Sequence, residues 1–178
     1  MTPSQYPVPA LWGQLGERLA GYFAAGARGI TGSELVLSSR DGEEFGRLRV
    51  DGPEGARFEA GDVRATVERL ASSRYRMLAG GAEVLAETAG SADAPEVRCG
   101  DRVYEARLGL VRNAAVAHSP VGSEAARIAG GLTNRSYEVS FDAKDEGSLP
   151  LAVFLLYRIV ELRRRAFLTG AGGDASSP

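Results

Sequence analysis

The chain has 178 residues, 44% of them hydrophobic, and a formal net charge of -2. That length is enough for a single domain with a sizeable core. Charge of both signs is spread along the chain, so no basic stripe predicts a nucleic-acid surface. The single cysteine, Cys99, excludes an internal disulfide and a cysteine-based zinc site. No basic signal-peptide region precedes the first charge, Glu17, so we expect a cytoplasmic protein able to associate with the inner face of the membrane.

The first 25 residues predict a flexible lead followed by a helix. Residues 1–10 contain three prolines and show no periodicity. An amphipathic helix is predicted over 11–25, where the apolar residues at helical spacing are Leu11, Trp12, Leu15, Leu19, Tyr22 and Phe23. This helix either packs on its own domain or lies in a membrane interface with Trp12 and Phe23 in the bilayer. Its polar face lacks the basic residues that usually accompany the second arrangement.

From residue 34 to residue 142 the apolar residues follow a period of two, which is typical of strands. Tight-turn sequences such as Asp41-Gly42, Gly80-Gly81 and Gly100-Asp101 separate pairs of these segments and predict hairpins. The predicted strands are 34–40, 44–50, 62–70, 75–79, 82–88, 95–99, 102–108, 110–118, 124–129 and 135–141. About 10–12 short strands at this spacing, with no βαβ pattern, predict an all-β sandwich or barrel.

A weak internal repeat runs through the predicted hairpins. Segments starting at Gly42, Gly81 and Gly122 share the order glycine, any residue, glutamate, apolar residue. Each would be the outgoing strand after a tight turn. Three copies are too few for a propeller, so repeated hairpins around one centre are favoured.

Residues 148–167 predict a helix whose first turns must be covered on every side by protein or lipid. No side chain from Leu149 to Tyr157 is charged, so its first turns are apolar all round. Ser148 is a suitable N-cap with Pro150 in the first turn. A membrane-spanning helix needs about 20 mostly apolar residues, whereas this segment becomes strongly charged from Arg158 onward. We therefore expect the preceding strands to wrap this helix, and we expect the tail at 169–178 to be disordered.

Repeated hairpins with Asp-Gly or Gly-Gly turns, followed by a very apolar C-terminal helix, resemble the tubby C-terminal-like superfamily, which includes the LURP-one-related proteins and the phospholipid scramblases. The resemblance covers roughly residues 34–168 and implies a closed antiparallel barrel of twelve strands threaded by the helix at 148–167. It leaves the activity open, because one fold serves several functions.

Residues with catalytic or metal-binding chemistry are scarce. His118 is the single histidine, which excludes a multi-histidine metal site, and no nucleophile-elbow, Walker or dinucleotide-binding motif occurs. The acidic residues Asp142, Asp145 and Glu146 resemble the calcium loop of scramblases, but Lys144 lies among them and would repel a cation. We therefore expect no metal, no cofactor and no catalytic residue.

The strongest candidate for a binding surface is Arg163-Arg164-Arg165, since arginines gain about 1 kcal/mol each near anionic lipid. Trp12 and Phe23 would supply a second contact. The alternative for the arginines is a solvated helix end paired with Glu161. The sequence thus favours a non-enzymatic binding or membrane-surface module, whose partner is an anionic membrane or another protein. A lipocalin-like carrier of a small apolar ligand is the alternative, and a hydrolase that uses scattered carboxylates ranks last.

Overall fold

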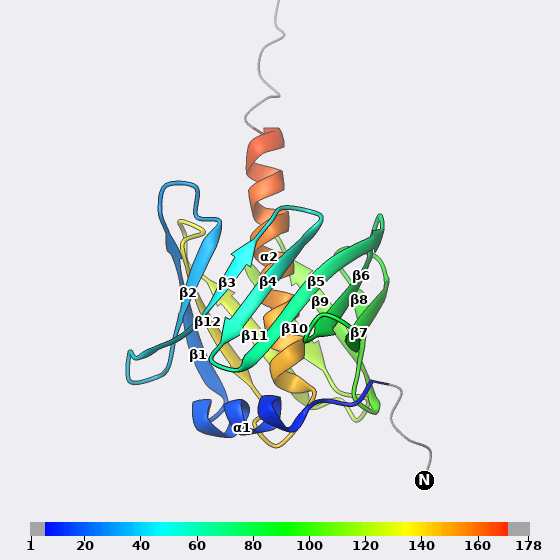
Figure 1. Ribbon diagram of the computed structural model, residues 1–178. Helices are drawn as coiled ribbons and strands as arrows, with labels where there is room; N and C mark the ends of the chain where they lie inside the picture. The colour runs from blue at the N-terminus through cyan, green and yellow to red at the C-terminus, as the bar shows by residue number, and fades with distance from the viewer. Residues whose placement is uncertain (1–5, 171–178) are drawn as a thin grey trace, which may run out of the picture.

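Twelve antiparallel strands close into a barrel around a helix (Figure 1). The computed structural model describes residues 6–170, with side chains up to residue 167. The strands are β1 (Tyr22–Arg28), β2 (Glu34–Ser38), β3 (Glu44–Val50), β4 (Gly55–Ala60), β5 (Val63–Ala71), β6 (Arg74–Ala79), β7 (Glu83–Gly90), β8 (Pro95–Cys99), β9 (Arg102–Gly109), β10 (Ala114–His118), β11 (Glu124–Gly130) and β12 (Ser136–Phe141). Each strand pairs with its sequence neighbours, and β1 closes the barrel against β12. The predicted closed barrel is confirmed.

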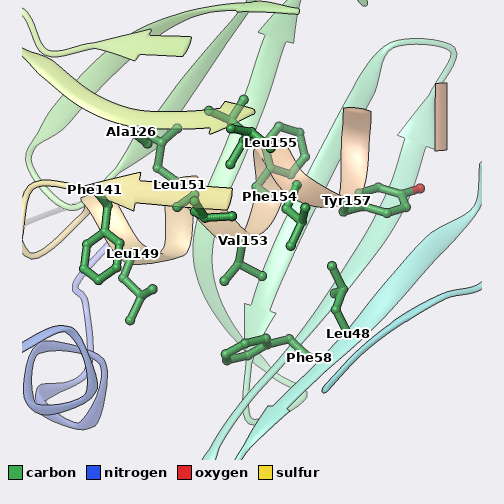
Figure 2. Packing of buried hydrophobic residues seen from close by; sticks show 14 of the residues in the cluster. Leu48, Phe58, Ala126, Phe141, Leu149, Leu151, Val153, Phe154, Leu155 and Tyr157 are labelled. Atoms are coloured by element: carbon green, nitrogen blue, oxygen red, sulfur yellow. The ribbon is translucent and has the colours of Figure 1, made fainter. Parts of the chain in front are cut away.

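Helix α2 (Ser148–Gly170) runs through the middle of this barrel. All side chains from Leu149 to Glu161 are buried. In Figure 2 the labelled side chains of α2, from Leu149 to Tyr157, point outward from the helix toward strand residues such as Leu48, Phe58 and Ala126. The prediction of a helix wrapped by strands is therefore confirmed. In a lipocalin-like carrier the helix would pack outside and leave the barrel to a ligand, so the position of α2 argues against that alternative.

The charged residues that α2 carries into the barrel are paired there. The Arg158 guanidinium lies 2.7 Å from the Glu161 carboxylate and donates to the Tyr75 hydroxyl at 3.0 Å. Glu161 also accepts from Arg165 one turn later. A buried charge is tolerated when its hydrogen-bonding capacity is met in this way.

Within residues 6–170, no helix has both the length and the apolar character needed to cross a membrane.

The repeat predicted from glycine and glutamate spacing corresponds to three equivalent hairpins, β2–β3, β6–β7 and β10–β11. Their first strands begin at residues 34, 74 and 114. Gly42, Gly81 and Gly122 occupy the turns with φ of 85°, 91° and 85°, a conformation that favours glycine. Each hairpin also contains a bulge at the same place. Such bulges increase strand twist and help a sheet to close.

The predicted helix at 11–25 is wrong in its second half. Helix α1 covers only Ala10–Leu19 and ends at Ala20, whose φ is 52°. Gly21 follows with φ of 79°, and Phe23 belongs to strand β1. The predicted lead at 1–10 is partly docked, because Tyr6 forms a bridge to Gly100 and its hydroxyl donates to Glu87. Residues 1–5 lie outside the described residues, as do residues 171–178 of the predicted tail, while 169–170 belong to α2.

The barrel has two different ends. Helix α1 lies across the end where α2 begins, and α2 leaves through the opposite end (Figure 1). Since neighbouring strands are antiparallel, alternate loops meet at the same end. We call the end where α2 leaves the exit face; it comprises the last turns of α2 and the loops at 29–33, 51–54, 72–73, 91–94, 110–113 and 131–135.

Candidate functional site: the exit face

Three aliphatic side chains stand in solvent on the exit face. The exposed fractions of Ile30, Val111 and Leu132 are 101%, 96% and 101%. They lie in the β1–β2, β9–β10 and β11–β12 loops, which are neighbours because the barrel order is β2-β1-β12-β11-β10-β9. Phe167 near the end of α2 is also exposed. Scattered exposed aliphatics are normal on proteins, but a group on adjacent loops at one end indicates an interaction surface.

The same three loops carry positive charge without negative charge. We call residues 28–33, 110–113 and 131–135 the basic arc; it contains Arg112 and Arg135 in the loops, Arg28 at the end of β1, and no aspartate or glutamate. Glu34, which lies opposite Arg28 in the sheet, forms ion pairs with Arg47 and Arg49. The other loops of the exit face contain Asp51, Glu54 and Asp93. The apolar residues and the unbalanced arginines therefore occupy the same half of the exit face.

The predicted arginines at 163–165 reach the exit face, but they differ in what they contact. Arg163 donates to the Asn134 side chain at 2.7 and 2.9 Å and to the Leu110 carbonyl, so it ties two loops of the basic arc to α2. Arg165 donates to Glu161 at 2.9 Å, as the alternative of a paired helix end predicts. Arg164 is half-buried beside the β1–β2 loop, where its Nη2 lies 3.0 Å from the position of a Cβ on Gly32. Of the three, Arg164 is the best placed to meet an external anion.

The structure places Trp12 and Phe23 away from this surface. Trp12 is buried at the opposite end of the barrel, where its ring stacks on Phe58 with centroids 5.2 Å apart. Phe23 points into the core between Phe45 and Phe141. Neither ring can insert into a bilayer unless the protein unfolds. The prediction that they form a second membrane contact is wrong, because the first packs α1 on the barrel and the second belongs to a strand.

The polar residues singled out in the sequence have structural surroundings. Asp145 is buried and accepts from the Tyr104 hydroxyl at 2.8 and 2.9 Å and from Arg102 at 3.2 Å, which anchors the start of α2. Burial raises the pKa of the Tyr104 hydroxyl, and its hydrogen bond to Asp145 acts in the same direction. Cys99 is buried in β8, and His118 is exposed on β10, two strands away. Among the described residues, no group of three or more acidic, histidine or cysteine side chains is arranged to hold a metal ion.

The apolar residues of the exit face are the part of the site that the sequence analysis missed. Their signal lies in the turns, since Ile30 follows Gly29, Val111 precedes Arg112-Asn113, and Leu132 follows Gly130-Gly131. Turn apices usually carry polar residues or glycine. An aliphatic residue at three such apices therefore points to a contact that the fold itself does not make.

The fold defines a class of protein: a closed antiparallel barrel of twelve strands threaded by its C-terminal helix. No protein-family model and no curated protein sequence matches the chain. The structure is similar to the X-ray structure of the Arabidopsis thaliana protein AT5G01750, a LURP-one-related protein, with a TM-score of 0.53. The similarity covers 76% of this chain and 90% of that chain at 12% sequence identity. At that identity the likeness shows the shared fold alone.

Proposed function

We propose that this protein is a non-enzymatic module of the tubby-like, LURP-one-related or scramblase-like kind that binds anionic membranes through its exit face. The observation that carries the proposal is the coincidence of Ile30, Val111 and Leu132 with the arginines of the basic arc. Apolar loop tips enter the acyl-chain boundary, while arginines contact anionic headgroups. The barrel axis then stands roughly upright on the membrane, with α1 farthest from it.

The apolar loop residues and the arginines each contribute a binding free energy large enough to matter for membrane attachment. Full burial of an aliphatic side chain contributes about 1.5–3 kcal/mol, and each arginine near anionic lipid contributes about 1 kcal/mol. Either set alone gives weak, reversible attachment, whereas the two together support stable peripheral binding. Anionic lipid is concentrated in the cytoplasmic leaflet, which favours the inner membrane face as the site of action.

The test is co-sedimentation with vesicles that contain phosphatidylserine. In the triple variant Ile30→Ser, Val111→Ser, Leu132→Ser we expect the free energy of membrane binding to weaken by at least about 4 kcal/mol, from the lower figure per side chain. That corresponds to a decrease of about three orders of magnitude in the partition coefficient. Val121→Ser is the matched control, because Val121 is 86% exposed in the β10–β11 loop at the opposite end. Equal pelleting of the two variants, or no pelleting of the wild type at low salt, would refute the proposal.

A further inference from the structure

Two arginines of the exit face converge on one glycine. A Cβ on Gly32 would lie 3.0 Å from Arg164 Nη2 and 3.8 Å from Arg135 Nη1. The two nitrogens are therefore at most 6.8 Å apart, the sum of 3.0 and 3.8 Å. Gly32 is buried with φ of 58°, so the absence of a side chain and the left-handed turn both allow the guanidinium groups to approach it.

Backbone carbonyls, and no carboxylate within residues 6–167, hold the guanidinium group of Arg135 in place. Arg135 Nη2 donates to the carbonyls of Ala27 at 3.2 Å and Gly29 at 2.9 Å, which fixes the orientation of its guanidinium group. Among the described residues, no carboxylate forms an ion pair with Arg135 or Arg164. Partial burial lowers the pKa of Arg164; the charge interaction with Tyr137 opposes this shift, and the like charge of Arg135 adds to it. An anion placed between the two groups would remove this repulsion.

We infer that Arg135, Arg164 and the turn at Gly32 form a binding site for a phosphate monoester group. A phosphate monoester carries close to two negative charges at pH 7 and three acceptor oxygens, which match two guanidinium forks. Each charge-assisted hydrogen bond spans about 2.8 Å, so two such bonds and the width of one phosphate group bridge the separation of the nitrogens. A phosphodiester, with one negative charge, leaves half of the positive charge unbalanced.

A phosphate group of this charge has two sources: a soluble phosphate, for which inorganic phosphate is the simplest probe, or the headgroup of a lipid such as phosphatidic acid. The lipid source rests on the proposed function, because Gly32 and Arg135 belong to the basic arc, in the same two loops as Ile30 and Leu132, and Arg164 of α2 lies beside them. In that case the site selects among anionic lipids, while the apolar tips and the remaining arginines supply attraction that all anionic lipids share.

The experiment has a soluble arm and a vesicle arm. In the first, inorganic phosphate is titrated into the full-length protein by calorimetry at constant ionic strength. In the second, vesicles containing phosphatidic acid are compared with phosphatidylserine vesicles of equal surface charge. Arg164→Gln removes one fork of the site, and Arg112→Gln removes an arginine of the basic arc that does not contact Gly32. Gly32→Ala keeps every charge and places a methyl group against Arg164.

We expect Arg164→Gln and Gly32→Ala to weaken phosphate binding at least tenfold and to abolish the preference for phosphatidic acid. Arg112→Gln keeps the affinity for phosphate and the preference for phosphatidic acid, while it lowers attachment to both kinds of vesicle by the same factor, because Arg112 belongs to the basic arc. Equal wild-type binding to the two lipids, with no heat from inorganic phosphate, would overturn the phosphate site and leave the proposed membrane function intact. Phosphate binding without attachment to either vesicle would support the site, assign it to a soluble ligand and refute the membrane function. Loss of phosphate binding in Arg112→Gln equal to that in Arg164→Gln would show nonspecific charge attraction and overturn the site.

Discussion

Replacing Glu161 by leucine tests the buried charges that α2 carries through the barrel. Arg158 and Glu161 are 4% and 3% exposed, and the substitution leaves the guanidinium group buried without its carboxylate. Removal of one partner from a buried pair costs about 3–5 kcal/mol. For a protein of this size each kcal/mol lowers Tm by about 2–4 °C, so Glu161→Leu lowers Tm by about 6–20 °C. Arg165 loses the same partner, but its side chain reaches solvent and rehydrates.

The double variant Arg158→Met, Glu161→Leu separates the loss of a partner from the loss of an interaction. Apolar replacement of both members of a buried pair is often neutral or stabilising, so we expect its stability to lie within about 1 kcal/mol of the wild type. Tyr75 keeps a hydrogen bond in the double variant, because its hydroxyl donates to the Pro53 carbonyl at 3.1 Å. Urea unfolding followed by the fluorescence of the single tryptophan, Trp12, measures all variants.

The control is Glu124→Leu. Glu124 pairs with Arg127 at the same i,i+3 spacing but on the barrel surface, with side-chain exposures of 39% and 52%. An exposed pair contributes about 0–1 kcal/mol, so this variant stays close to the wild type. The reasoning is refuted if Glu161→Leu costs no more than Glu124→Leu, or if the double variant is as unstable as the single one.

Three further predictions concern the α1 end of the barrel. Gly147→Ala places a Cβ 2.5 Å from the Tyr104 hydroxyl and destabilises the protein by about 1–3 kcal/mol in thermal unfolding, whereas Gly13→Ala, with open space around it, stabilises α1 by up to about 1 kcal/mol. Trp12→Ala removes a buried ring and lowers the free energy of unfolding by about 3–5 kcal/mol. Vesicle binding by the folded fraction stays unchanged; a loss of binding would show that Trp12 contacts the membrane after all. Burial raises the pKa of Cys99 to about 12, so the folded thiol stays protonated and unreactive toward a thiol reagent at pH 8–10. The same thiol reacts in urea, and fast labelling without urea would contradict its burial.

The parts of the fold that the sequence predicts are those with strong local patterns. Leu149 to Tyr157 has no charged residue, and an apolar helix of nine residues has to be enclosed, so the pattern predicts both the helix and its position. Gly42, Gly81 and Gly122 require left-handed turns, which predicts the three equivalent hairpins. Closure of the barrel follows because a sheet that wraps a helix on all sides has no free edge.

Two strands are missed because their local signals compete with others. In β1, Tyr22 and Phe23 continue the helical spacing of Leu15 and Leu19, although the positive φ at Ala20 and Gly21 ends the helix before them. Strand β4, residues 55–60, follows a turn-forming segment with Gly52 and Pro53. From the sequence, this turn and the strand together resemble one long loop. In both cases pairing with other strands determines the structure: β1 pairs with the distant strand β12, and β4 is held between its sequence neighbours β3 and β5.

The exit face depends even more on tertiary structure. Ile30, Val111 and Leu132 are up to 102 residues apart in the sequence, and only the barrel order makes their loops neighbours. The convergence of Arg135 and Arg164 on Gly32 has the same origin. The sequence indicates the arginines at the end of α2, but it does not reveal that one of them ties loops together while another lies beside an uncompensated charge.

The most direct test of the central claim is the depth of the exit face in a membrane. Leu132→Cys and, as a control, Val121→Cys provide one exposed thiol each for a nitroxide label, since the native Cys99 is buried. On phosphatidylserine vesicles we expect the label at 132 to be shielded from an aqueous relaxing agent and accessible to oxygen in the bilayer, and the label at 121 to remain in water. Aqueous accessibility at 132 in the vesicle-bound protein, or shielding at 121 instead, would contradict the claim that this protein meets the membrane through the end where α2 leaves the barrel.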